Sequence, residues 1–149
     1  MHNHEWVARL RETMALTDEV LGEVLAAGGA PATPEDVAAF ADVPLSDDQS
    51  RALLDGLIAW RRGPSPPRPG TPPDVSGNLV LKKLRIALDL QEPDLVKLFA
   101  AGGLQVGPRA VRPWFRRASS KHYKRVDDEV LTAFFAGLAS LGAPPGPLT

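Results

Sequence analysis

The stretch LGEVLAAGG at residues 21–29 recurs as LVKLFAAGG at residues 95–103. In both stretches, apolar residues at helical spacing lead into Ala-Ala-Gly-Gly, where glycine supplies the left-handed conformation that commonly ends a helix. At the same offset of 74, residues 3–40 align with residues 77–114 without a gap, and a later block aligns at an offset of 81. The sequence therefore predicts a tandem duplication, with seven extra residues before the last helix of the second copy.

Each copy carries four segments in which apolar residues recur at intervals of three, four and seven. This spacing indicates amphipathic helices, and no alternating run of Val, Ile and Thr indicates a strand. Asn3 or His4 in the first copy and Asn78 in the second are the predicted N-caps of the first helices. We predict an all-α fold, a tandem duplication of a four-helix module. Its core should contain seven residues of the second copy, together with their equivalents in the first copy. The seven residues are Leu84, Leu88, Leu98, Phe99, Val111, Phe134 and Leu138.

Proline marks the boundaries of the two copies. Six prolines lie between Gly63 and Gly77, a composition typical of an extended, semi-rigid linker. We predict a first helical repeat at 1–63, a Pro-rich linker at 64–76, a second helical repeat at 77–142 and a flexible tail at 143–149.

The composition excludes several classes of protein. The 149 residues contain no cysteine, which excludes disulfides and thiolate chemistry. No run of eighteen apolar residues predicts a membrane span, and no secretory signal is expected at the N-terminus. We therefore expect a cytoplasmic protein that does not enter a membrane, and we expect no cofactor.

The net charge of −1 conceals an asymmetry between the copies. Residues 1–63 hold 5 basic and 11 acidic side chains, a net charge of −6, whereas residues 77–142 hold 11 basic and 6 acidic ones, a net charge of +5. Such a division indicates either a half that binds polyanions or two halves that attract each other.

Residues 105–126 contain seven cations and no acid, with aromatic residues between the cations. Cations neutralise phosphates and aromatic rings stack on bases, so this strip predicts non-specific nucleic-acid binding. The preceding helix and Gly-Gly turn loosely resemble a helix-turn-helix, with Arg109 to Arg117 as the reading helix, although Pro113 argues against it. The candidate binding residues are Arg109, Arg112, Arg116, Arg117, Lys121, His122, Tyr123, Lys124 and Arg125.

Other interpretations of the strip remain open. It is also consistent with a solvated face, or with a surface that docks on the acidic first copy. The leading prediction is a non-enzymatic binding module, and the alternative is a protein-interaction or regulatory scaffold that meets an acidic partner. The distinguishing observation is whether Trp114 or Tyr123 is exposed on an open basic face.

Two arginines occupy equivalent places within apolar helical stretches of the two copies. A buried guanidinium needs a carboxylate or carbonyl partner. We predict structural ion pairs between Arg11 and Asp47, and between Arg85 and Asp128 or Asp127.

No catalytic or metal motif stands out. Ser119, Ser120, His122 and Asp127 are the residue types of a hydrolytic triad, but no nucleophile elbow surrounds them, so a small hydrolase is only the third alternative. His2 and His4 are incidental histidines near the N-terminus, and no metal is expected.

The chain resembles a bacterial family of unknown function, the YehS-like proteins (domain of unknown function 1456), which carry two tandem copies of the domain. The resemblance lies in Gly77-Asn78 followed by residues 81–90, in Trp114 to Arg117, in His122-Tyr123 and in residues 134–138. The first copy lacks the Trp-Arg and His-Tyr elements. The resemblance implies a helical fold and a bacterial cytoplasm, and it implies no activity.

Overall fold

The computed structural model describes residues 2–63 and 75–142, and all regular structure within these residues is helical. This confirms the predicted all-α fold. Most of the predicted linker and the whole predicted tail lie outside the described residues. The helices are α1 (Asn3–Thr13), α2 (Asp18–Ala27), α3 (Pro34–Ala39) and α4 (Asp47–Arg62) in the first half, then α5 (Gly77–Ala87), α6 (Glu92–Ala101), α7 (Pro108–Val111), the short 3-10 helix η1 (Arg112–Phe115) and α8 (Asp128–Leu141) in the second half.

The second helix of each half ends where the sequence predicts. Gly28 and Gly102 are the C-cap residues of α2 and α6. Gly29 and Gly103 follow with φ of +91° and +92°, in the region that glycine enters without steric cost. The Gly-Gly stretches therefore end both helices.

The predicted N-caps of the first helices are wrong. Helix α1 is capped by His2 and α5 by Ser76, whose hydroxyl oxygen accepts a hydrogen bond from the Leu79 N–H (3.2 Å). Asn3 and Asn78 lie one and two positions inside their helices, where their amides contact other segments of the chain.

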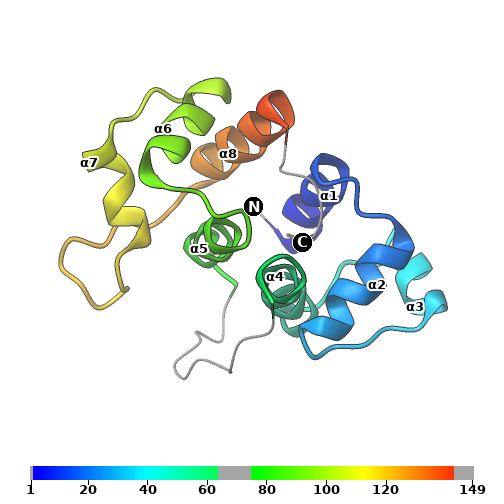
Figure 1. Ribbon diagram of the computed structural model, residues 1–149. Helices are drawn as coiled ribbons and strands as arrows, with labels where there is room; N and C mark the ends of the chain where they lie inside the picture. The colour runs from blue at the N-terminus through cyan, green and yellow to red at the C-terminus, as the bar shows by residue number, and fades with distance from the viewer. Residues whose placement is uncertain (1, 64–74, 143–149) are drawn as a thin grey trace.

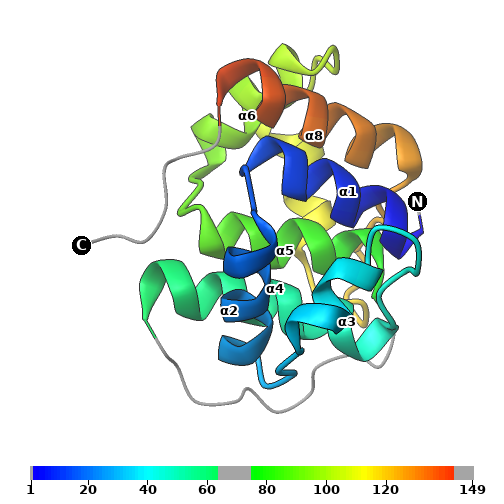
Figure 2. The same ribbon diagram turned by 90° about the vertical axis from the view of Figure 1, so that its right-hand side faces the viewer.

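Four helices form the centre of the molecule, and the others cover its two sides (Figure 1). Helix α4 packs closely against α5, and α1 packs against α8. The first helix of each half therefore contacts the last helix of the other half more than that of its own. Helices α2 and α3 lie on one side of this centre, and α6, α7 and η1 on the other; Figure 2 shows α1, α4, α5 and α8 running across the molecule.

One hydrophobic core extends through both halves. Every α-helix contributes buried residues to this core. The short helices α3 and α7 contribute one each, Val37 and Val111. All seven residues predicted for the core of the second copy are buried, which confirms that part of the prediction: Leu84, Leu88, Leu98, Phe99, Val111, Phe134 and Leu138.

Paired glycines bring the backbones of two helices close together in each half. A Cβ atom on Gly102 would lie 1.8 Å from the carbonyl oxygen of Ala133, and one on Gly28 would lie 1.8 Å from that of Ala52. In the opposite direction, a Cβ atom on Gly137 would lie 2.0 Å from the oxygen of Leu98, as one on Gly56 would lie 1.9 Å from that of Val24. The close contacts in the two halves therefore join equivalent residues, which are related by the offsets of 74 and 81 found in the sequence.

The predicted pair of Arg11 with Asp47 is wrong. Arg11 pairs with Asp18 (2.6 Å), while Asp47 accepts a hydrogen bond from the amide of Asn3 (2.6 Å). The tight turn after α1, in which Ala15 has a φ of +52°, brings the start of α2 beside Arg11.

Arg85 is also committed elsewhere. Its Nε donates to the carbonyl of Leu90 (3.1 Å), and its guanidinium lies 4.8 Å from the centre of the Phe115 ring. Arg85 therefore contacts a carbonyl and an aromatic ring, and the predicted pair with Asp128 or Asp127 is wrong.

Opposite charges meet where the halves join. Arg61 is 3% exposed, and burial lowers the pKa of its guanidinium. Polar contacts between described residues cross the boundary: Arg61 Nε donates to the carbonyl of Ala87 (2.7 Å), Arg62 pairs with Asp89 (3.0 Å) and Lys83 pairs with Asp55 (2.7 Å).

Candidate functional site

The basic strip occupies α7, η1 and the long loop that leads to α8. Helix α7 is only four residues long, and the chain continues as a 3-10 turn before it leaves helical geometry at Arg116. All seven cations of the strip are exposed, as is His122, and Tyr123 is half-buried. We call the exposed residues together with Tyr123 the cationic surface: Arg109, Arg112, Arg116, Arg117, Lys121, His122, Tyr123, Lys124 and Arg125.

The reading helix expected from Arg109 to Arg117 is not formed. Pro113 lies inside this segment, and proline supplies no N–H for an α-helical hydrogen bond. The α-helical part ends at Val111, and η1 follows it. The cations therefore lie mainly on a loop and not along one face of a helix that would fit a groove.

One cation of the surface is already paired. Arg112 donates through Nε and Nη2 to the two carboxylate oxygens of Glu92, at 2.9 and 3.0 Å. This hydrogen bonding lowers the pKa of Glu92 below its ordinary value and raises the pKa of Arg112. Among the residues that the structure describes, the other six cations of the surface form no ion pair. Six positive charges are thus exposed to water.

The ring of Trp114 and one face of the Phe115 ring are not available to a ligand. Trp114 is 5% exposed and packs edge to face against Phe99, with 5.3 Å between the ring centres. Phe115 is half-buried beneath Arg85. Exposed His122 and half-buried Tyr123 remain as rings that a base can reach.

The loop is anchored by Asn78, for which the sequence predicts the role of a helix cap. The amide nitrogen of Asn78 donates to the carbonyls of Trp114 (3.0 Å) and Lys124 (2.9 Å), and its oxygen accepts from the Val126 N–H (2.9 Å). A polar residue among apolar ones in the first turn of a helix is the only sequence signal of this role, and it does not identify the partners.

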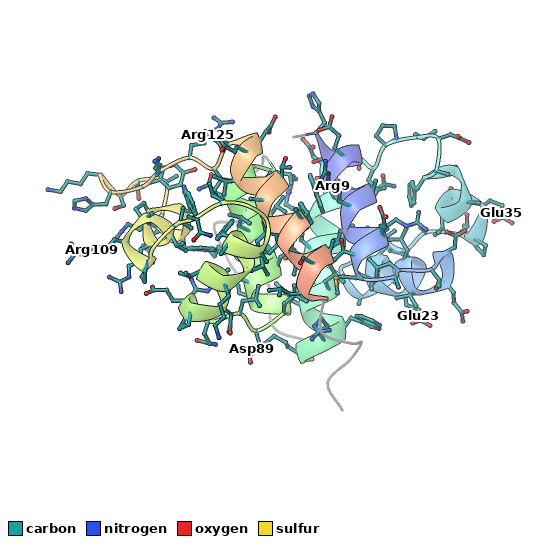
Figure 3. All side chains as sticks on the ribbon, turned by 90° about the horizontal axis from the view of Figure 1, so that it is seen from above. Arg9, Glu23, Glu35, Asp89, Arg109 and Arg125 are labelled. Atoms are coloured by element: carbon teal, nitrogen blue, oxygen red, sulfur yellow. The ribbon has the colours of Figure 1, made fainter. Side chains whose placement is uncertain are left out.

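The cationic surface and the acidic side chains of α2 and α3 lie at opposite ends of the molecule. Figure 3 shows Arg109 and Arg125 at one end and Glu23 and Glu35 at the other. Two acids of the first half near its last helix have other partners, since Asp47 accepts from Asn3 and Asp48 pairs with Arg51 (3.3 Å). The strip therefore does not dock on the acidic half of its own chain.

A hollow of about 540 Å³ lies beside the loop, where α5 and α8 begin. Arg125 lines it, but so do Asp127, Asp128 and Glu129. Three carboxylates against one guanidinium make this hollow unfavourable for a phosphate, so it does not extend the cationic surface.

The residues of the supposed triad have structural contacts. Asp127 caps α8 by accepting from the Val130 N–H (2.9 Å), and the hydroxyl of Ser120 accepts from the His122 N–H (3.2 Å). Within 2–63 and 75–142, no group of three His, Asp or Glu side chains is placed to hold a metal ion. None of the helices in these ranges is both long enough and apolar enough to cross a membrane.

Comparison with known proteins finds relatives of unknown role. Residues 77–141 match a family model described as "Protein of unknown function (DUF1456)". The chain is similar to the uncharacterized protein YehS of Escherichia coli strain K12, with 27% identity over 154 residues that cover 94% of this chain and 96% of YehS. No solved structure matches the chain.

Proposed function

We propose a function for this chain, whose residues 77–141 match a family of unknown function and which is similar to the uncharacterized YehS: it binds nucleic acid without sequence preference through the cationic surface. The observation that carries the proposal is the set of six exposed cations without an ion-pair partner among the described residues. Phosphates attract such a set strongly, and their binding releases counterions.

The position of the charges supports this proposal. The acidic half would repel phosphate if it lay beside the basic strip, but Glu23 and Glu35 project from the far end of the molecule (Figure 3). A polyanion that contacts Arg109 and Arg125 therefore approaches the positive end, and screening over about 8 Å at physiological salt weakens the distant repulsion.

The form of the surface favours contacts with phosphates over reading of bases. A four-residue α7 offers no long helix for the major groove. Trp114 is buried, so stacking is left to His122 and Tyr123. Contacts of this kind give affinity with little sequence preference.

The test is a salt titration of binding to random duplex DNA, single-stranded DNA and RNA. If four cations engage phosphates, log K should fall with log salt with a slope of about −3.6 on duplex DNA. Reversing two exposed cations, Arg116→Glu with Arg117→Glu, should abolish binding and leave the fold intact, since exposed charges contribute little to stability. The matched control is Lys82→Glu with Lys97→Glu, which changes the net charge equally at two exposed lysines outside the strip.

The expected result is loss of binding in the Arg116 and Arg117 variant and retention of most of it in the control. Binding that is undetectable at about 50 mM salt, where phosphate contacts are strong, would remove the proposal. Equal losses in both variants would show that net charge alone, and not this surface, attracts the ligand.

A protein-interaction scaffold is the second candidate. The observation that favours it is that the cationic surface is not covered by the acidic half of the same chain (Figure 3), which leaves it accessible to an acidic protein. Direct capture of an acidic protein with no binding to any nucleic acid would favour this candidate.

The proposal includes three broader statements. The protein acts by binding and not as an enzyme, and it acts in the cytoplasm, where nucleic acid is available and a chain without cysteine needs no oxidising compartment. The chain arose by duplication of one four-helix module. The corresponding close contacts of Gly28 with Ala52 and of Gly102 with Ala133 support the last statement.

A further inference from the structure

Asn78 joins the two ends of the loop that carries the cations. It lies in the first turn of α5 and is 8% exposed. Its single side chain contacts the backbone at Trp114, where the loop begins, and at Lys124 and Val126, where the loop ends. Arg116, Arg117 and Lys121 lie between these anchor points, and Lys124 and Arg125 lie at the second one.

The amide of Asn78 is matched to this position. A buried carboxamide is unfavourable unless its donors and its acceptor are satisfied. Here the nitrogen donates two hydrogen bonds, at 3.0 and 2.9 Å, and the oxygen accepts one at 2.9 Å. Asparagine is also a weak helix former, so α5 gains nothing from it locally. What the residue provides is the connection to the loop.

The rest of the loop is held by few contacts. The Lys124 N–H donates to the carbonyl of Pro113 (3.1 Å), which closes the loop next to the Asn78 contacts. Inside the loop, the Ser120 N–H donates to the carbonyl of Arg117 (2.9 Å), and the Tyr123 N–H donates to the carbonyl of Ser120 (3.1 Å). Without Asn78, the buried side chains of Trp114 and Val126 and one backbone bond would still hold the two ends, but the loop backbone between them would lose three hydrogen bonds, and the exposed cations would sample more positions.

We propose that Asn78 is a positioning residue, which holds the cationic loop in the conformation that binds phosphate groups. The inference deepens the proposed nucleic-acid binding and depends on it. A loop that is ordered before binding loses less conformational freedom when it binds, so the same cations bind more tightly. Asn78 touches no ligand and acts through the backbone of residues 114–126.

The test replaces Asn78 with leucine, which has a similar size and no hydrogen-bonding group. Hydrogen exchange of the Val126 amide, which donates to Asn78, should become about tenfold faster, as expected for the loss of one hydrogen bond. Affinity for duplex DNA at fixed salt should fall by about tenfold. The slope of log K against log salt should stay unchanged, because the same cations still meet the phosphates.

Two further variants separate positioning from general stability. Val37→Ala removes buried volume in α3 of the first half, far along the chain from the loop, and should lower stability without changing Val126 exchange relative to other amides or DNA affinity. Asn78→Ser keeps one hydroxyl donor, and it provides a milder variant if the leucine variant does not fold. Asn78→Ser should also speed Val126 exchange and weaken DNA binding, but both changes should be smaller than in Asn78→Leu.

The possible outcomes distinguish this inference from the proposed function. Wild-type protein that fails to bind DNA would remove the proposed function, while the Val126 exchange rate would still report whether Asn78 orders the loop. If the Asn78 variants bind DNA as tightly as wild type, or if Val126 exchange is unchanged in them, the positioning role is wrong. An equal loss of affinity in the Val37 variant would also overturn it.

Discussion

Trp114 illustrates how one residue supports two interpretations. Its helical spacing from Val111 predicts a side chain that faces the core, and its place among cations predicts a ring that stacks on bases. In the structure it is 5% exposed and packs against Phe99, so the first interpretation is confirmed. Local spacing identified the buried face, whereas composition alone could not show which aromatic residues a ligand reaches.

Replacing Trp114 with phenylalanine should therefore reduce stability and leave binding unchanged. The indole N–H has no hydrogen-bond partner among the described residues, so the main loss is buried volume, with an expected cost of about 1–2 kcal/mol in the free energy of unfolding. Urea denaturation measures the stability, and a DNA titration measures the binding. Tyr123→Ala is the comparison, since loss of a stacking ring typically costs about 1–3 kcal/mol per base. An equal loss of binding in both variants would mean that Trp114 contacts the ligand.

The elements that the sequence predicted are those that carry strong local signals. Apolar spacing followed by Gly-Gly predicted both second helices and their ends. The contacts between elements were harder to predict, because they depend on turns. Arg11 and Arg85 lie at equivalent positions, and tight turns containing Ala15 and Asp89, each with a φ of +52°, bring Asp18 beside the first and the Leu90 carbonyl beside the second. Equivalence in sequence identified the matching residues but not their partners.

The same limit applies to the candidate site. The cations and their exposure follow from a segment without acids or long apolar runs. Asn78 was expected to cap α5, because asparagine is common at N-caps and the residue stands near the start of an apolar helix. Only the path of a loop 36 to 48 residues away makes it an anchor.

Helix packing in each half depends on glycines that no larger residue can replace. Gly102→Ala would place a Cβ atom 1.8 Å from the backbone oxygen of Ala133, so α6 and α8 would have to separate. We expect a loss of about 1–3 kcal/mol or more in the free energy of unfolding, and a similar loss for Gly28→Ala. Gly107→Ala is the control, because nothing lies within 4 Å of its Cβ position. Urea midpoints would contradict this packing if Gly102→Ala and Gly107→Ala had equal stability.

At the scale of the whole molecule, the net charges of the two parts do not reveal where their charged side chains lie relative to each other. A chain with charges of −6 and +5 in its two parts can fold so that they face each other or face apart. Here the shared core lies between them: Arg109 and Arg125 project from one end of the molecule, and Glu23 and Glu35 project from the other (Figure 3). The pairs that do cross the boundary, Lys83 with Asp55 and Arg62 with Asp89, lie where the halves join.

The shared core also determines how the halves depend on each other. Helix α5 packs mainly on α4, and α1 packs mainly on α8, so each half supplies the last helix that covers the first helix of the other. The sequence correspondence relates α1 to α5 and α4 to α8. The two cross-contacts are therefore equivalent, as in an arrangement with approximate two-fold symmetry.

This arrangement gives a test with the isolated second half. A chain of residues 75–142 would expose the apolar faces of α5 and α8 that now meet α4 and α1. In a symmetric dimer, α8 of one copy can take the place of α4 against α5 of the other, and both exposed faces are covered at once. We therefore expect this fragment to fold as a dimer whose Tm rises with protein concentration, because association stabilises the folded state by mass action. Analytical ultracentrifugation with thermal denaturation at several concentrations measures both properties. A folded monomer with a Tm independent of concentration would show that the second half has a sufficient core of its own, and that the cross-contacts are not required for folding.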